Sequence, residues 1–161
     1  MFARPLIDGV DFALNGRELR GNLPLDALPR LKELLANERG EIAFLLRGYA
    51  KDSHLMLDVE LGGECRLRCQ RCLGELLFPV AMASSLRLAP PGEIDAVDME
   101  DETECIETST RIDVLSLVED ELLLGMPYAP RHPAGKCLVP ENALNQSASP
   151  FAVLANRIKK H

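Results

Sequence analysis

The chain has 161 residues and a formal net charge of −7, with 47% hydrophobic and 27% charged residues. This composition is typical of a globular domain with one hydrophobic core. No apolar run approaches the roughly 18 residues that a membrane-spanning helix needs, and no signal-peptide pattern follows the N-terminus. We therefore expect one domain spanning residues 1–161, located in the cytoplasm and without a membrane partner.

The negative charge is concentrated in one segment. Residues 93–107 contain eight acidic residues and no basic one, whereas the rest of the chain has 18 Lys and Arg against 17 Asp and Glu. Like charges at this density repel one another and find little core. We expect a mobile acidic loop at about 90–107, with a short strand near 103–107.

A helix is predicted before this loop, close to the N-terminus. Asp26 suits an N-cap, and four leucines between positions 28 and 35 recur at helical spacing. Pro29 would fall in the first turn, where proline is tolerated. Gly40 ends the pattern.

Antiparallel strands are predicted next. One covers residues 42–49, and apolar residues then alternate with polar ones over 55–61 and again over 65–69. The Gly-Gly pair at 62–63 is typical of a hairpin or a bulge. A further strand is expected over 76–88, and Pro79 indicates that this strand lies at an edge or contains a bulge.

The clearest helix follows the acidic loop. Asp113 is its expected N-cap, residues 114–124 fill it, and Gly125 is expected as a left-handed stop before Pro127. The spacing predicts a polar stripe that includes Ser116, Glu119 and Asp120.

Leu123 falls in the same stripe. The helix is therefore either covered on most sides or offers Leu123 to a partner. A flexible segment at about 133–148 follows, and a last helix is expected to begin with Ser149 as N-cap and Pro150 at its first position. Together the elements predict an α+β fold, with an antiparallel sheet or partly open barrel and two to three packed helices.

The sharpest chemical motif is Cys69-Gln70-Arg71-Cys72. Two thiolates at this spacing can occupy two corners of a tetrahedral metal site. His132 and Cys137 are the candidate second pair, which would complete a Cys3His structural zinc site. Buried or idle thiols and redox use are alternatives, because the two pairs lie some sixty residues apart.

Enzyme motifs are not recognised in the sequence. No His-x-Glu precedes a Pro-Cys-x-x-Cys as in zinc deaminases, and neither a His-Glu-x-x-His nor a Gly-rich phosphate loop occurs. We therefore assign no catalytic residue. Cys65 and Cys105 are interpreted as small strand residues, with Cys65 as a spare ligand at most.

Two charged clusters are candidates for contact with RNA or a partner protein. Arg66, Arg68 and Arg71 surround the cysteines and could bind phosphates. They could equally pair with the acidic loop. The acidic loop could itself imitate RNA and hold a basic ribosomal protein, so the two clusters predict opposite partners.

A further candidate for contact with a partner is the run of three consecutive carboxylates, Glu119, Asp120 and Glu121. Adjacent helical side chains point in different directions, so these residues are not a catalytic pair. Glu121 falls within the apolar face and is expected at its rim, or as a hydrogen-bond acceptor.

The order of motifs resembles that of the YceD family over roughly residues 40–161. The matching segments are Cys69-Gln70-Arg71-Cys72, then Leu117-Val118-Glu119-Asp120-Glu121-Leu122-Leu123-Leu124-Gly125-Met126-Pro127, then His132 and Cys137, and finally Pro150-Phe151-Ala152-Val153-Leu154-Ala155. Ser149 stands where the family usually has Asn, and both cap helices well.

The resemblance implies a cytoplasmic, non-enzymatic factor needed for accumulation of 23S ribosomal RNA. Its expected partner is a 23S rRNA precursor or a large-subunit ribosomal protein. The resemblance also favours zinc at Cys69, Cys72, His132 and Cys137. Two other classes stay open: a zinc-dependent hydrolase or RNA-modifying enzyme, and a homodimeric interaction protein that associates through Leu123.

Overall fold

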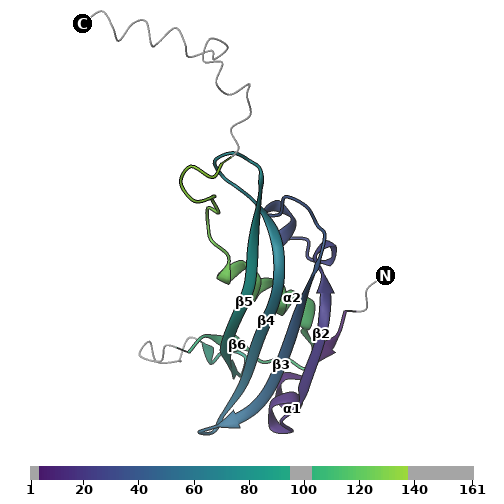
Figure 1. Cartoon of the computed structure of the whole chain (residues 1–161). Coiled ribbons are helices and arrows are strands. Elements are labelled where there is room, and N and C mark those ends of the chain that lie inside the picture. Colours follow the sequence, from purple (N-terminus) through teal and green to yellow (C-terminus); the bar gives the residue numbers. More distant parts are fainter. Residues whose placement is uncertain (1–3, 95–102, 138–161) are drawn as a thin grey trace, which may run out of the picture.

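The computed structural model describes residues 4–94 and 103–137. Its main feature is a five-stranded sheet in the order β2-β3-β4-β5-β6 (Figure 1). The strands are β2 (Glu18–Pro24), β3 (Glu41–Lys51), β4 (His54–Arg68), β5 (Glu75–Ala89) and β6 (Cys105–Glu107). Neighbours are antiparallel except β5 and β6, which are parallel.

Two helices and a small second sheet complete the fold. The elements are β1 (Leu6–Ile7), α1 (Gly9–Leu14), β7 (Ile112–Asp113) and α2 (Val114–Gly125), with β1 paired to β7. The predicted α+β class is confirmed. Within the described residues, β2 and β6 are the two edge strands and do not pair with each other. The sheet is therefore open rather than a closed barrel.

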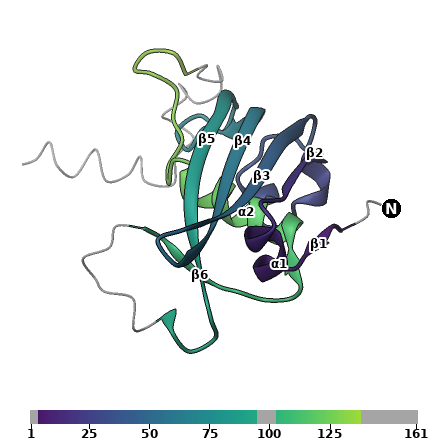
Figure 2. The same ribbon diagram turned by 90° about the horizontal axis from the view of Figure 1, so that it is seen from below.

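One face of the sheet carries the core. The alternating side chains of β4 on that face are buried; Leu57 and Val59 are at most 1% exposed, as are Val118 and Leu122 of α2. Figures 1 and 2 show α1 and α2 on the same side of the sheet. The opposite face is open to solvent. No helix in the part of the chain that the structure describes is long and apolar enough to span a membrane.

The Gly62-Gly63 pair is neither a hairpin nor a bulge. β4 runs through it as one strand, and its register with β3 and β5 has no break. Leu61 before the pair and Cys65 after it are both buried and both have odd residue numbers. The alternation of inward and outward side chains therefore continues through the two glycines. Gly63 has a φ of 143°, and a Cβ there would come within 3.0 Å of the Glu41 carbonyl oxygen. Glycine is required here by backbone conformation and close approach, not by a turn.

The helix expected over residues 26–35 does not form. The segment contains only two short 3-10 turns, Leu25–Ala27 and Leu31–Glu33. Leu28 precedes Pro29 and has a ψ of 88°, because a residue before proline is driven away from the helical region. Leu28, Leu31 and Leu35 are buried nevertheless, and Leu34 is half-buried. The helical spacing of these leucines therefore indicated which residues are buried, not that the segment is a helix.

The predicted α2 is confirmed with two corrections. The Asp113 side chain accepts hydrogen bonds from the N–H groups of Leu115 and Ser116. Gly125 is not left-handed. It is the last helical residue, and a Cβ there would lie 2.4 Å from Met82 Sδ. Glycine therefore allows α2 to approach β5 closely.

The predicted polar stripe of α2 is also wrong in part. Glu119 is only 2% exposed, and Leu123 packs partly buried against the core, whereas Leu124 is 69% exposed. The expected position of Pro79 is confirmed, because β6 covers β5 only at Arg87–Ala89 and leaves Pro79 on an edge.

The short strand expected near 103–107 is β6. The third expected helix, most of the flexible segment and residues 95–102 of the acidic loop lie outside the described residues.

Candidate metal centre

A tight loop at the tip of the β4–β5 ribbon presents the first two cysteines. Cys69 follows the last residue of β4, and its N–H donates to the carbonyl of Gly74 (2.9 Å). The N–H of Leu73 donates back to the carbonyl of Cys69 (2.9 Å), with Leu73 at a φ of 59°. Six residues thus reverse the chain and turn both sulfurs to one side.

A second loop, which follows α2, brings the other pair. The N–H of Gln70 donates to the carbonyl of the buried Pro130 (2.8 Å), which joins the two loops. His132 Nε2 lies 2.8 Å from the carbonyl oxygen of Glu75. An acceptor at that distance requires a proton on Nε2, so in the neutral imidazole the lone pair lies on Nδ1, the nitrogen nearer the cysteine sulfurs.

The four side chains converge. One ligand atom from each of Cys69, Cys72, His132 and Cys137 lies within 4.8 Å of every other. The sulfurs of Cys69 and Cys137 are 3.8 Å apart, and His132 Nδ1 is 3.4 Å from Cys72 Sγ and 3.7 Å from Cys137 Sγ.

These distances match the edges of a zinc tetrahedron. Zinc bonds of about 2.3 Å to sulfur and about 2.0–2.1 Å to nitrogen give sulfur–sulfur edges of about 3.8 Å and sulfur–nitrogen edges of about 3.6 Å. The Glu75 carbonyl supplies the outer hydrogen bond that ligating histidines ordinarily make. The donor set and its geometry therefore fit a structural zinc ion.

The electrostatics of the cluster also suit a cation. Burial alone would raise the pKa of the Cys69 thiol, but hydrogen bonds from the N–H groups of Cys72, His132 and Arg71 lower this pKa to about 5. Burial, and then the neighbouring Cys72 and Cys69, raise the pKa of Cys137. Thiolates held this close repel one another, and a divalent cation would relieve that repulsion.

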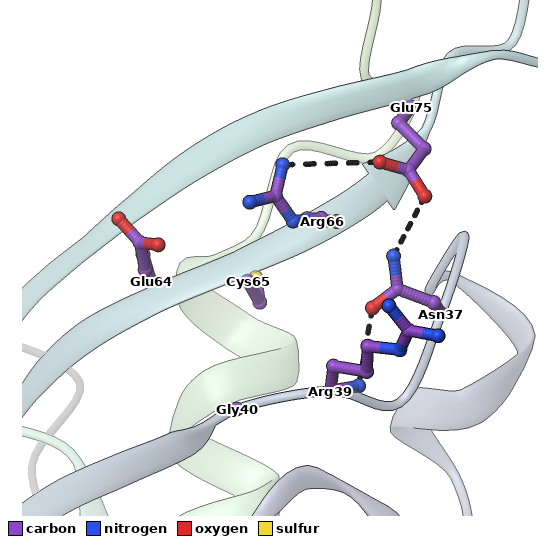
Figure 3. Close-up of a pocket in the computed structure, with 7 residues that line it drawn as sticks. All are labelled: Asn37, Arg39, Gly40, Glu64, Cys65, Arg66 and Glu75. Carbon is purple, nitrogen blue, oxygen red and sulfur yellow. Dashed lines mark hydrogen bonds and ion pairs between the residues drawn. The ribbon is translucent and has the colours of Figure 1, made fainter.

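Cys65 and Cys105 are not part of the cluster. Cys65 is buried in the core, and burial raises the pKa of its thiol to about 11. It lies on the floor of a pocket of about 380 Å³ beside Arg66 and Glu75 (Figure 3). Its interpretation as a small strand residue is therefore adequate.

Five exposed basic residues surround the metal cluster. Arg66 and Arg68 lie on the open face at the end of β4, and Arg71 lies between the first two cysteines. Arg131 and Lys136 directly neighbour His132 and Cys137. We call these five residues the basic tip: Arg66, Arg68, Arg71, Arg131 and Lys136. The last two were not expected from the sequence, where the charges on the second loop were not weighed.

Only one member of the basic tip has an acidic partner among the described residues. Arg66 Nη1 lies 3.8 Å from Glu75 Oε2, and Asn37 Nδ2 donates to Glu75 Oε1 at 2.7 Å (Figure 3). None of the described ion pairs involves the other four. Four of the five basic residues thus form no ion pair within the described part of the chain, although Glu75 lies opposite Arg68 in the β4–β5 register.

The three consecutive carboxylates have separate roles. Glu119 accepts hydrogen bonds from the N–H groups of Arg30 (2.6 Å) and Leu31 (3.1 Å), and from Arg30 Nε (3.0 Å). It therefore anchors the 3-10 segment to α2. Asp120 forms an ion pair with the Arg30 guanidinium (2.6 Å), and Glu121 accepts from the Ser84 hydroxyl of β5.

Fold and cluster together define a class: a small α+β protein in which a Cys3His cluster ties the tip of a long β-ribbon to a loop after the last described helix. Residues 57–156 match the family described as "Large ribosomal RNA subunit accumulation protein YceD", and the chain belongs to that family. A protein of the same description from Haemophilus influenzae is 27% identical over 168 residues, which cover 96% of this chain and 95% of the relative. No solved structure matches the chain significantly.

Proposed function

We propose that the chain is a non-enzymatic factor in large-subunit assembly that supports 23S rRNA accumulation and binds precursor rRNA through the basic tip. A structural zinc ion at Cys69, Cys72, His132 and Cys137 holds the tip together. The family and the relative, both described as large ribosomal RNA subunit accumulation proteins, support the assignment to ribosome assembly. The observation that carries the binding mode is the convergence of four ligands between two loops that both carry exposed cations.

The zinc ion acts as a clamp in this proposal. Cys69 and Cys72 come from the ribbon, and His132 and Cys137 come from the second loop, so the ion fixes the distance between the two groups of basic residues. Four protein ligands also leave no position for a substrate or an activated water, which favours a structural over a catalytic role.

The basic tip suits phosphate recognition without base-specific readout. Lysine and arginine bind the nucleic-acid backbone through charge, and each contact releases counterions. Aromatic residues make up only 4% of the chain, so stacking can contribute little. Among the described residues, Tyr128 is fully exposed in the same loop that leads to His132 and could stack on one base.

Charge reversal tests the proposal. Purified protein carrying Arg68→Glu and Arg71→Glu should bind 23S rRNA fragments at least tenfold more weakly than the parent chain. The matched control is Arg20→Glu with Lys51→Glu, which reverses two exposed charges on β2 and at the β3–β4 turn, away from the cluster. The slope of log Kd against log salt should also fall by roughly 0.7 for each single-strand phosphate that the variant no longer neutralises.

Zinc content is measured on the same preparations. The proposal expects about one zinc per chain in both double variants, because neither pair includes a ligand. Equal loss of RNA affinity in the control pair, or unchanged affinity in the tip pair, would refute binding through the basic tip.

A further inference from the structure

The outer edge of β5 is uncovered over most of its length. β6 pairs with it only at Arg87–Ala89, and no other strand in the described ranges 4–94 and 103–137 pairs with that edge. In Figure 1 this edge faces left, with β6 at its lower end and the end of α2 beside its middle. A strand edge of this kind is a template for an additional extended segment.

Hydrogen-bond direction identifies the residues that such a segment would meet. The N–H of Arg87 donates outward to the carbonyl of Glu104 (2.8 Å). Backbone groups alternate in direction along a strand, and the β4–β5 register is unbroken. Ala81, Ala83 and Ser85 therefore also direct their backbone groups outward. Pro79 has no N–H and ends this run of donors.

A groove with an apolar floor runs beside the same edge. Two adjoining hollows of about 390 and 430 Å³ share Glu104, Glu121 and Leu124 as lining residues. Their apolar surface comes mainly from β5, β6 and α2: Met82, Leu86, Ile106, Leu117, Leu123 and Leu124. Val59 and Leu61 of β4 also line the first hollow. An extended chain on the β5 edge could direct alternate side chains into these hollows.

The charge around the groove has one sign. Glu104, Asp120 and Glu121 line the two hollows, and no Lys, Arg or His lines either of them. The arginine that pairs with Asp120 is Arg30, which is not among the lining residues of the groove. Such a rim favours a positively charged occupant and disfavours nucleic acid.

We propose that the β5 edge at residues 81–85, with the adjoining groove, is a docking site for an extended basic peptide segment of a protein partner. The segment adds to β5 as a strand, places alternate apolar residues in the hollows, and places Lys or Arg residues against Glu104 and Glu121. This site is separate from the basic tip and rests on neither the zinc nor the RNA proposal.

The acidic run of the chain itself is the competing occupant. Asp98, Glu100, Asp101 and Glu102 are joined covalently to the groove through Thr103. Their negative charges would lie against an acidic rim if they paired with β5, and like charges across strands are destabilising.

The test uses the full chain and a blocked heptapeptide of alternating Lys and Val, with its alternating Glu and Val counterpart as control. The basic peptide should bind measurably by fluorescence anisotropy and the acidic one at least tenfold more weakly. Binding should protect the amides of Ala81, Ala83 and Ser85 from hydrogen exchange, since their N–H groups acquire partners. Equal binding of both peptides, or binding without that protection, would overturn the proposal.

Two variants separate strand pairing from simple charge attraction. Ala83→Pro removes an outward N–H but none that the β4 ladder uses, so the chain should fold while peptide affinity falls at least tenfold. Glu121→Gln keeps the acceptor for Ser84 and removes one charge, so affinity should fall several-fold. Unchanged affinity in both variants would refute the site.

Two further measurements test whether another segment of the chain already covers the β5 edge, and whether peptide binding depends on the basic tip. Amides 81, 83 and 85 that are already protected in the free chain would show that another segment of the protein covers the edge, and would overturn the proposal. Arg68→Glu with Arg71→Glu should leave peptide binding unchanged, so a failure of the RNA proposal does not affect this one.

Discussion

The middle of the β4–β5 ribbon and its tip are held by different forces. In the middle, Leu57 and Leu86 are at most 1% exposed and belong to the same hydrophobic core as α2. Leu67, near the end of β4, is still buried in that core, but the loop beyond it carries Leu73 at 68% exposure and is held by backbone hydrogen bonds and the Cys3His cluster. A loop that extends beyond the hydrophobic core needs another interaction to order it. The proposed metal supplies that interaction.

The largest expected effect is loss of the metal. Cys72→Ser removes one of four ligands, and the zinc content of the purified protein should fall from about one per chain to near zero. Amides of residues 69–74 should then exchange rapidly, while those of β3 and the middle of β4 keep their protection. Mass-spectrometric metal analysis and hydrogen exchange measure both effects.

Cys105→Ser is the matched control for that experiment. Cys105 is partly exposed on β6 and lies outside the cluster. The Cys105→Ser variant should therefore have the zinc content of the parent chain and the same protection of amides 69–74 from hydrogen exchange. Unfolding of the whole sheet in Cys72→Ser would show that the tip and the middle of the ribbon are one cooperative unit rather than two separately stabilised regions.

Thiol titration compares the two regions directly. If the loop at residues 69–74 keeps its hydrogen bonds when the metal is removed, the Cys69 thiolate should form with a midpoint near 5, whereas Cys65, buried in the core, should form its thiolate only near 11. Because the folded-state pKa of Cys69 lies below its ordinary 9.0, its stabilising effect on the tip is complete above pH 9.0. That effect declines as pH falls and is lost below about 5.

Ultraviolet absorbance of thiolates follows this titration, with Cys69→Ser assigning the low midpoint. A midpoint near 9 together with retained amide protection at residues 69–74 would contradict the expected role of the surrounding N–H groups.

The middle of the molecule should depend on one buried carboxylate. Glu119→Ala leaves the N–H groups of Arg30 and Leu31 without their acceptor, and loss of such a buried network should lower the free energy of unfolding by about 2–4 kcal/mol. Asp120→Ala removes only an exposed ion pair and should cost about 1 kcal/mol or less. Urea denaturation measures both, and equal costs would show that Glu119 is not the anchor.

Sequence patterns predicted the site better than parts of the fold. The Cys-x-x-Cys and the distant His132 and Cys137 were expected to meet, and they do. Their chemistry is specific enough that few alternatives compete. Arg131 and Lys136 were not predicted as part of the site, although their neighbours His132 and Cys137 were predicted as ligands. Whether a charged residue joins a basic patch depends on which loops lie side by side in the folded chain.

The wrong predictions about the fold have one cause. The periodicity of apolar residues shows which side chains are buried, but it does not show which other segment they pack against. The leucines after Asp26 are buried at helical spacing, yet Pro29 and the Glu119 carboxylate fix a different backbone. Glu119 lies 89 residues from Arg30 in sequence, so no local pattern could reveal the contact. The continuous strand through Gly62-Gly63 could have been predicted from the sequence, because the apolar residues on both sides of the pair have odd residue numbers and are buried on the same face.

The smallest expected effect tests whether stability of the middle is transmitted to the tip. Asp113→Ala removes the N-cap of α2, which accepts from Leu115 and Ser116, and should lower the free energy of unfolding by about 1 kcal/mol. Zinc content and exchange at residues 69–74 should not change, because α2 reaches the cluster only through the loop that begins at Met126. Asp113→Asn retains a capping oxygen and should restore most of the loss. If Asp113→Ala also releases zinc, the loop after α2 depends on the helix as well as on its ligands, and the two regions are coupled through it.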